Sequence, residues 1–363
     1  MKKLFTSLLV IALMAFSLCS LAGCKKPEKT VPVSEESFDL STLKGCVLHM
    51  VGQGGTPEIV LKKVLDEANI EYVDGSDEPV EGKVAIVYHE EGSEVIGALK
   101  AGTIQFAILG EPAVSTALQK VGENLIIAAD LQQEWKIATK TDVGYPQTGL
   151  VAKSSLIESD PELVKTIAKL TVDNALCLKS DAASLIACLK EKGATVPDAF
   201  SAEGVARTNI DPTFGAQART DLENYFNILR DFKPAMIGGK LPEDGFYYDG
   251  ADIQTYKENS KTFIKNNADG AKVTDSVTIV MPDGGPALAM AYLMKDYQTI
   301  NGTRVTYKIV DGAAQIKQSI MSGEADFAIM PTNLAATLYN NNFPIKLIGT
   351  NSYGLLYLLS RKA

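Results

Sequence analysis

Histidine and tryptophan are scarce in this chain. Its 363 residues include only two histidines, His49 and His89, and one tryptophan, Trp135. His49 lies inside an apolar run, so a packed histidine is its simpler interpretation. His89 precedes two glutamates, so a solvated histidine is its simpler interpretation. The sequence has no Gly-x-Ser-x-Gly elbow and no arrangement of nucleophile and base. These absences argue against an enzyme, and we expect no catalytic residue and no cofactor.

Cysteine is also sparse, at five residues, and no spacing in the chain is typical of a metal site. Cys19 and Cys24 fall in the N-terminal segment, which leaves Cys46, Cys177 and Cys188. A disulfide between Cys177 and Cys188 would suit an exported protein, but buried free thiols are the simpler interpretation.

Positive charge is in deficit, with 35 lysines and arginines against 44 aspartates and glutamates and a net charge of −9. Nucleic-acid binding needs a cationic face, so we expect no nucleic-acid partner. The apolar fraction of 46% and the charged fraction of 22% are those of a globular protein, and the length suggests two domains.

Long apolar runs are absent except at the N-terminus, where Lys2 and Lys3 precede an apolar stretch from Leu4 to Leu18. This stretch is shorter than the roughly 20 residues that span a membrane. Leu21-Ala22-Gly23-Cys24 follows it. The segment resembles a bacterial lipoprotein signal, which implies cleavage before Cys24 and attachment of lipid, palmitate included, to that cysteine. An ordinary secretory peptide is the alternative. We expect a lipid-anchored protein on the extracytoplasmic face of a bacterial cell membrane.

One pattern occurs at both ends of the remaining chain. A β-like run at 46–51 breaks into Gly52-Gln53-Gly54-Gly55-Thr56-Pro57, and a second at 277–281 breaks into Pro282-Asp283-Gly284-Gly285-Pro286. With an offset of 221, five residues of the first unit coincide with five of the second: Gly102, Phe106, Ala107, Ile108 and Thr116 with Gly323, Phe327, Ala328, Ile329 and Thr337. The alternative is the general likeness of any two βα units. The repeat predicts two α/β lobes that face each other across a cleft.

Apolar periodicity predicts the elements of both units. Strands are expected at 46–51, 84–88, 104–109, 125–129, 148–153, 277–281, 305–310, 326–330, 345–348 and 354–359. Helices are expected at 57–68, 92–101, from the capping box at Ser159 to about Leu178, from Ser180 to Gly193, and at 216–230.

These features resemble a known family on residues that together cover most of 40–360. The matching segments are Gly52 to Glu58, Gly92 to Gly102, Gly110-Glu111-Pro112, Asp160 to Val164, Gly239 to Tyr248, and the block from Val277 that includes Pro331 to Ala336. They are similar to the solute-binding proteins of ABC importers in the nitrate, sulfonate, taurine and thiamine-pyrimidine group. The resemblance implies an α/β, two-lobed type II periplasmic-binding-protein fold.

The order of the units departs from that family, in which the unit resembling 277–359 comes first. The sequence therefore suggests a circular permutant, and a domain-swapped pair or a fusion or gene-model error are the alternatives. The expected division is a signal peptide at 1–23, a tether at 24–40, lobe 2 at 41–147, a helical completion of lobe 1 at 148–250, a linker at 251–275 and the first half of lobe 1 at 276–363.

Strand-end loops supply the candidate ligand-binding residues, because ligands bind beyond the carboxyl ends of parallel strands. They are Gln53, Gly54, Gly55, Thr56, Glu111, Trp135, Asp283, Gly284, Gly285, Thr332, Asn333 and Asn351, with Asn209 from the family resemblance. Gln132, Tyr145 and Tyr353 lie on similar loops. For each, a role in turns, helix caps or burial is the alternative. The turns contain acids but no lysine or arginine, which favours a neutral or cationic solute over a bare anion.

We expect a monomeric binding protein that closes on a small solute and delivers it to an ABC permease in the membrane. An enzyme on the same fold, of the pyrimidine-precursor or menaquinone-pathway kind, and a ligand-sensing lipoprotein are the alternatives. No further long apolar stretch predicts a membrane span.

Overall fold

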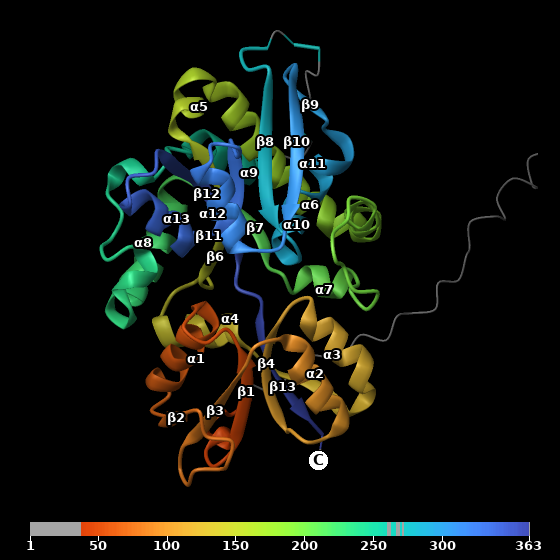
Figure 1. Cartoon of the computed structure of the whole chain (residues 1–363), viewed down its shortest axis with the longest axis vertical. Coiled ribbons are helices and arrows are strands. Elements are labelled where there is room, and N and C mark those ends of the chain that lie inside the picture. The colour runs from red at the N-terminus through yellow and green to blue at the C-terminus, as the bar shows by residue number, and fades with distance from the viewer. Residues whose placement is uncertain (1–37, 260–262, 266–268, 271, 363) are drawn as a thin grey trace, which may run out of the picture. The chain divides into compact units, whose positions relative to one another are not determined.

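A computed structural model describes residues 38–362, except 260–262, 266–268 and 271. The signal peptide, Cys24 and most of the tether lie outside the described residues. Two β-sheets organise the described chain, one of six strands and one of seven (Figure 1). We keep the names lobe 2 and lobe 1 for the parts built on them. Within the described residues, no helix combines the length and apolarity that crossing a membrane requires.

Lobe 2 contains the six-stranded sheet. In spatial order its strands are β2 (Tyr72–Asp74), β3 (Val84–His89), β1 (Val47–Val51), β4 (Phe106–Gly110), β13 (Leu356–Arg361) and β5 (Leu125–Asp130). β1 pairs in parallel with β3 and β4, whereas β13 pairs antiparallel with β4 and β5. The helical elements of this lobe are η1 (Leu40–Leu43), α1 (Thr56–Glu67), α2 (Gly92–Ala101), α3 (Ala113–Val121), η2 (Gly122–Asn124) and α4 (Leu131–Thr139).

Lobe 1 contains the seven-stranded sheet. Its order is β7 (Ile210–Phe214), β12 (Ile345–Tyr353), β6 (Pro146–Lys153), β11 (Phe327–Pro331), β8 (Ser276–Pro282), β10 (Thr303–Val310) and β9 (Thr299–Ile300). Its helical elements are α5 (Ser154–Ser159), α6 (Pro161–Glu191), α7 (Ala202–Ala206), α8 (Gly215–Phe232), η3 (Pro234–Ile237), η4 (Asp244–Phe246), α9 (Ala251–Asn259), α10 (Gly285–Leu288), α11 (Ala291–Asp296), α12 (Ala313–Met321) and α13 (Thr332–Asn340).

The two sheets share one strand order, which confirms the internal repeat. β3-β1-β4-β13-β5 in lobe 2 corresponds to β10-β8-β11-β6-β12 in lobe 1. Each sheet contains one strand that runs antiparallel to both of its neighbours. This strand is β13, between β4 and β5, in lobe 2 and β6, between β11 and β12, in lobe 1. The aligned β4 (Phe106–Gly110) and β11 (Phe327–Pro331) occupy equivalent places, separated by the expected offset of 221.

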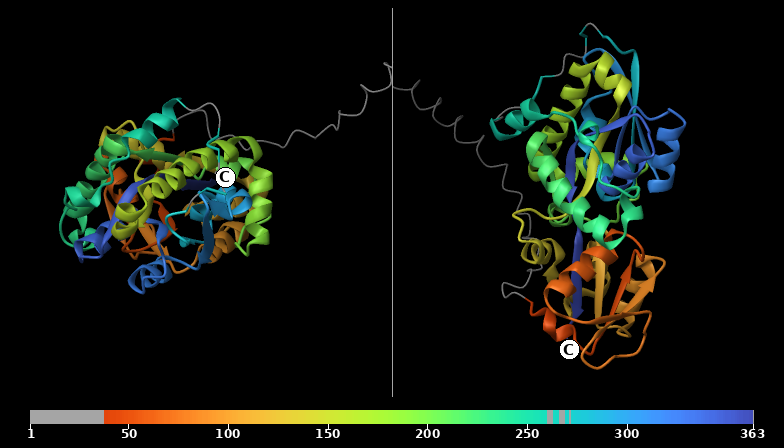
Figure 2. Two further views of the ribbon diagram at one scale, coloured as in Figure 1. Left: turned by 90° about the horizontal axis from the view of Figure 1, so that it is seen from above. Right: turned by 90° about the vertical axis from the view of Figure 1, so that its left-hand side faces the viewer.

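The antiparallel strand of each sheet comes from the chain as it leaves the other lobe. The chain crosses from α4 to β6 and returns from β12 to β13. The right-hand view of Figure 2 shows the dark-blue C-terminal strand entering the red-to-orange part of the chain. This corrects the expected division, in which the last strand belonged to lobe 1. β13 belongs to the sheet of lobe 2, because it pairs antiparallel with β4 on one side and with β5 on the other.

Local sequence explains where the long helices begin and end. The side chain of Asp160 accepts a hydrogen bond from the backbone N–H of Leu163 at 3.2 Å and so caps α6. The break expected near Ser180 is present as non-helical backbone at Asp181 (φ −143°, ψ 48°). α2 ends at Gly102, whose φ of +76° favours glycine.

The expected linker at 251–275 is docked on lobe 1 where the structure describes it. It begins with α9, in which Ile253 is fully buried. The buried carboxylate of Asp173 on α6 accepts hydrogen bonds from the hydroxyl of Tyr256 at 2.6 Å and from the backbone N–H of Ile264 at 2.9 Å. These contacts hold α9 and the stretch around Ile264 against α6.

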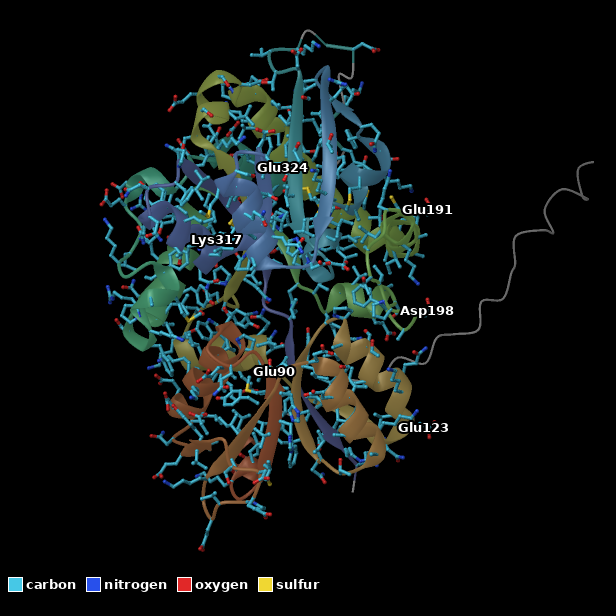
Figure 3. All side chains as sticks on the ribbon, viewed as in Figure 1. Glu90, Glu123, Glu191, Asp198, Lys317 and Glu324 are labelled. Atoms are coloured by element: carbon cyan, nitrogen blue, oxygen red, sulfur yellow. The ribbon has the colours of Figure 1, made fainter. Side chains whose placement is uncertain are left out.

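The hydrophobic core continues from one lobe into the other. One cluster of buried residues includes Leu48 of β1, Trp135 of α4, Tyr225 of α8 and Met330 of β11. A second cluster, which includes Ile167 and Ile279, lies within lobe 1. Acidic side chains are instead spread over the exposed surface of both lobes, among them Glu90 and Glu123 on lobe 2 and Glu191, Asp198 and Glu324 on lobe 1 (Figure 3).

Candidate functional site

The glycine-rich turn of lobe 2 contacts helix α8 of lobe 1. Gln53 and Gly54 are exposed, and Gly55 is partly buried. The hydroxyl of Thr56 lies 3.1 Å from the hydroxyl of Tyr225 on α8. Lys233, just after α8, donates from Nζ to the carbonyl of Gly54 at 3.5 Å. The turn therefore belongs to the surface where the lobes meet, as the repeat predicts.

The equivalent turn of lobe 1 contacts lobe 2 at a different place. A methyl group added to Gly284 would lie 3.9 Å from Cδ of Pro112, after β4. One added to Gly285 would lie 3.4 Å from Leu355, on the returning crossover. The carboxylate of Asp283 accepts hydrogen bonds from the backbone N–H groups of Thr195 and Gly284, at distances from 2.7 to 3.1 Å. Asp283 thus shapes its own turn.

Glu111 is occupied by an ion pair between the lobes. Its buried carboxylate accepts hydrogen bonds from Nε of Arg207 at 2.5 Å and from the hydroxyl of Ser115 at 3.0 Å. Burial raises the pKa of Glu111, and the Arg207 guanidinium opposes that rise. Arg207 was not expected at this surface, because it follows α7, far from the strand-end turns in sequence.

The polar residues that follow β11, and Asn351 near the end of β12, are buried or partly buried. The hydroxyl of Thr332 donates to the carbonyl of Pro146 at 2.7 Å, and Asn333 is partly buried. Asn351 is 0% exposed. Neither its amide nitrogen nor its amide oxygen has a hydrogen-bond partner among the described residues. A buried amide without partners costs about 1–3 kcal/mol per polar group, so Asn351 marks a place where a polar partner would stabilise the fold.

Trp135 belongs to an aromatic cluster between the lobes. Its ring packs edge-on against Tyr145 and Tyr225, with centroid distances of 5.6 and 5.9 Å. Trp135 is only 2% exposed. Such pairs add about 0.5–1.5 kcal/mol to the burial of the rings. Trp135 therefore joins lobe 2 to the crossover residue before β6 and to α8 of lobe 1.

Unpartnered polar atoms gather near the two crossover segments. Within the described residues they belong to Gln132, Tyr145, Gln147 and Asn351, and one more lies on Asn340. The amide of Gln132 fits between the two crossovers: a methyl group on Gly144 would lie 1.9 Å from its Oε1, and one on Gly354 2.2 Å from its Nε2. Glycine at both positions is needed for this close approach.

A cavity of about 680 Å³ opens beside these crossovers. This volume is typical of small-molecule sites. α4 of lobe 2, the crossover at 142–144, and α6, α7, α8 and α9 of lobe 1 contribute to its wall. The polar lining consists of amides, acids and lysines: Gln132, Gln133, Asn209, Gln217 and Gln254; Asp142, Asp211 and Asp221; Lys136, Lys179 and Lys257, with Thr213 and Tyr353.

A smaller cavity of about 250 Å³ adjoins the first. Trp135 and Tyr225 are in its wall. The two cavities share Asp142, Val143, Gly144, Gln217 and Asp221. The crossover at 142–144 and residues of α8 thus form a wall common to both cavities. The larger cavity is polar, and the smaller one lies beside the aromatic cluster.

Few of the expected ligand-binding residues line these cavities. Asn209 lines the larger cavity and Trp135 the smaller, and Gln132 and Tyr353 are also in the wall of the larger. The glycine turns and Glu111 contact the other lobe outside these cavities. Thr332 and Asn351 are buried, and Asn333 is partly buried. Asp221 was missed, although an acid on the apolar face of an amphipathic helix is a signal that the sequence contains.

No protein-family model and no curated protein matches the chain. Among solved structures it is similar to the periplasmic VFT2 domain of Bordetella pertussis BvgS, with 10% identity, 87% of this chain and 80% of that chain covered, and a TM-score of 0.33. It is also similar to a phosphate-binding protein of a Streptococcus pneumoniae ABC transporter. The identity is 9%, the match covers 87% of this chain and 89% of that chain, and the TM-score is 0.34. The alkanesulfonate-binding protein SsuA from Xanthomonas axonopodis pv. citri is similar with 11% identity. This match covers 88% of this chain and 66% of that chain, with a TM-score of 0.32. With TM-scores this low, the fold is better defined by its own strand order.

Proposed function

We propose that this chain is an extracytoplasmic solute-binding protein that closes two lobes on a small molecule and delivers it to an ABC importer. The observation that carries the proposal is the cavity of about 680 Å³ beside the two crossovers that join the lobes. Because the chain passes between the sheets once in each direction, these two segments can serve as a hinge. A solute that contacts both sides of the cavity would favour the closed state by its differential affinity.

The permuted order is part of the proposal. In this interpretation the ancestral chain ran from the end of β13 directly into the start of β1. Support comes from Phe106 in β4, which contacts both ends of the described chain: its ring packs 6.4 Å from that of Phe38, and it pairs with Ser360 of β13. Ends that lie this close are suited to circular permutation. A domain-swapped pair and a fusion are the alternatives.

Anchoring and delivery complete the proposed role. Lipid on Cys24 would hold the protein at the extracytoplasmic face of the membrane, beside the permease that receives the solute. The solute class suggested by the sequence resemblance is nitrate, sulfonate or pyrimidine-like.

Titration of a soluble form beginning at Lys25 tests the binding function. Nitrate, sulfonates, pyrimidines and amines would be screened by thermal shift, and the hits measured by calorimetry. A ligand at 100 times its Kd stabilises the folded state by about 2.7 kcal/mol. We expect one class to bind and small-angle X-ray scattering to report closure.

Ala206→Trp provides a specific check, because Ala206 lines the cavity on the exposed face of α7. The indole should occupy the cavity and weaken binding at least about tenfold. Ala101→Trp places the same side chain on exposed α2 and serves as the matched control. Absence of any binding, or turnover of the bound solute, would contradict the proposed function.

A further inference from the structure

Asp221 is a buried acid in the wall of both cavities. It lies on α8 among Ala218, Leu222 and Tyr225, and it is only 5% exposed. Its Oδ2 accepts a hydrogen bond from the hydroxyl of Tyr353 at 2.8 Å, and its Oδ1 accepts one from Nε2 of Gln217 at 2.8 Å. A carboxylate has about four acceptor positions, so each oxygen can still accept a second hydrogen bond.

No cation in the described part of the chain pairs with Asp221. The charge of Lys257 lowers the pKa of Asp221, but no hydrogen bond or ion pair joins the two side chains among the described residues. The ammonium of Lys257 pairs with Asp211 at 2.9 Å and lies 3.4 Å from the hydroxyl of Thr213. Buried carboxylates are normally paired, since removing an unpaired charge from water is costly. Burial accordingly raises the pKa of Asp221. Asp221 therefore lacks a cationic partner, and it lines a cavity large enough to hold a small cationic solute.

We propose that the larger cavity binds a small solute carrying one protonated amine, and that Asp221 is the counter-ion of that amine. This inference rests on the proposed solute-binding function and gives it a ligand class. An ammonium can donate to the free acceptor positions of both carboxylate oxygens and gain a charge-assisted hydrogen bond. Tyr353 and Gln217 hold the carboxylate in place through their own hydrogen bonds.

The rest of the lining restricts the solute further. Lys136, Lys179 and Lys257 line the same cavity, and their charges disfavour a polyamine. Gln132, Gln133 and Asn209 offer amide groups to a neutral or anionic remainder of the solute. The chemistry of the cavity thus fits a monoamine that meets Asp221, or a small zwitterion whose anionic group meets the lysines.

Pairs of ligands with and without an ammonium group test the amine class separately from the solute-binding function. Tyramine and 5-aminovalerate would be compared by calorimetry with tyrosol and valerate, which lack the ammonium group, and with putrescine. We expect an amine to bind, its partner without ammonium to bind at least about tenfold more weakly, and putrescine to gain nothing from its second charge. If neither amine binds, or if tyrosol and valerate bind equally well, the amine class is wrong. Binding by a solute without ammonium would still leave the solute-binding function intact.

Asp221→Asn tests the counter-ion directly. The amide has nearly the same shape but no charge, and loss of a charge-assisted hydrogen bond weakens amine binding by about 10- to 100-fold. Asp231→Asn, an exposed position on the same helix, is the matched control. Unchanged amine affinity in Asp221→Asn would overturn the proposal.

The wild-type protein gives a second measurement if Asp221→Asn does not fold. Protonation of Asp221 removes its charge, so affinity for tyramine should fall as the pH is lowered toward the raised pKa of this acid. Over the same range the affinity for a neutral ligand such as tyrosol should stay flat. An amine affinity that does not depend on pH down to about pH 4, the ordinary range of an aspartate, would contradict the proposal.

Discussion

Arg207 of lobe 1 and Glu111 of lobe 2 form a buried ion pair, with Nε 2.5 Å from Oε1 and side-chain exposures of 14% and 0%. The second guanidinium contact, from Nη2 to the hydroxyl of Ser115 at 3.0 Å, also joins the lobes. The backbone carbonyl of Arg207 in turn accepts a hydrogen bond from Tyr357 of β13 at 2.9 Å. This one residue therefore ties the end of α7 to three elements of lobe 2.

Arg207→Met should destabilise the protein strongly. Removing one partner of a buried pair leaves an uncompensated charge, and such losses cost about 3–5 kcal/mol. Urea unfolding would measure the change. Arg219→Met is the matched control, because Arg219 pairs with Glu223 and Asp244 at an exposed site where about 1 kcal/mol or less is expected. Glu111→Gln combined with Arg207→Met should be less harmful than Arg207→Met alone. Equal losses in the Arg207 and Arg219 variants would contradict a buried pair.

Gly354→Ala should disturb the returning crossover. The added methyl group would lie 2.1 Å from Cζ of Tyr145 and 2.2 Å from Nε2 of Gln132. Overpacking of this kind costs about 1–3 kcal/mol, and the shift of Gln132 should also weaken solute binding. Gly97→Ala in α2 meets no atom within 4 Å and should be neutral or slightly stabilising. Thermal unfolding of both variants checks the prediction, which is wrong if Gly354→Ala melts like the wild type.

The sequence predicts the elements better than it predicts their partners. Only Gly354 and Leu355 separate β12 from β13, which suggests neighbouring strands of one sheet. β13 pairs instead with β4 and β5, because tertiary pairing is decided by an open sheet position more than 200 residues away. The apolar runs and the repeat, in contrast, are local properties, and β1, β4, β8 and β11 begin and end close to where these predict.

The site was harder to predict for the same reason. Glycines in the two turns indicated ligand contact, yet Gly54 and Gly284 have φ values of +75° and +85°, so the turns themselves require glycine. Gly285 makes room for Leu355. The ion pair of Glu111 depends on Arg207, 96 residues away, and no local pattern connects them. Asp221 had a local signal, because it is an acid on the apolar face of a helix. That signal indicates a binding residue only once the structure shows the acid buried with no cation paired to it among the described residues.

The two histidines should make stability depend on pH. Nδ1 of His49 lies 3.0 Å from Nε2 of His89, and Nδ1 of His89 lies 3.4 Å from Oε2 of Glu94. Burial, and secondly the charge of His89, hold the pKa of His49 below its ordinary value. As the pH falls below about 6.5, the unfolded chain therefore binds a proton at His49 before the folded chain does. The stability contributed by neutral His49 is complete above that pH and declines below it.

Urea unfolding at pH 7.5, 6.5 and 5.5 would measure this dependence. The range stays above the titration of ordinary carboxyl groups. We expect the free energy of unfolding to decrease toward pH 5.5 in the wild type and to change less in His49→Gln, which keeps a hydrogen-bonding side chain but cannot titrate. Parallel pH profiles of the two proteins would show that His49 is not the titrating group.

Rejoining the chain at its present ends tests the permuted order. A variant would begin at Ser276, run through Arg361, continue through a short glycine-serine linker into Leu40, and end at Lys265, so that α9 and the contacts of Tyr256 and Ile264 with Asp173 are kept. Phe38 and Ser360 both contact Phe106, so the linker has a short gap to span. Both sheets keep all their strands in this variant, and we expect it to fold and to bind the same solute as the natural order. A chain joined in the same way but opened between Ile329 and Met330, inside β11, should not fold, because it divides a buried strand. If the first variant also fails to fold while the unpermuted soluble protein is stable, the connection from β13 to β1 is not an ancestral one, and a domain-swapped pair or a fusion becomes the better account of the order.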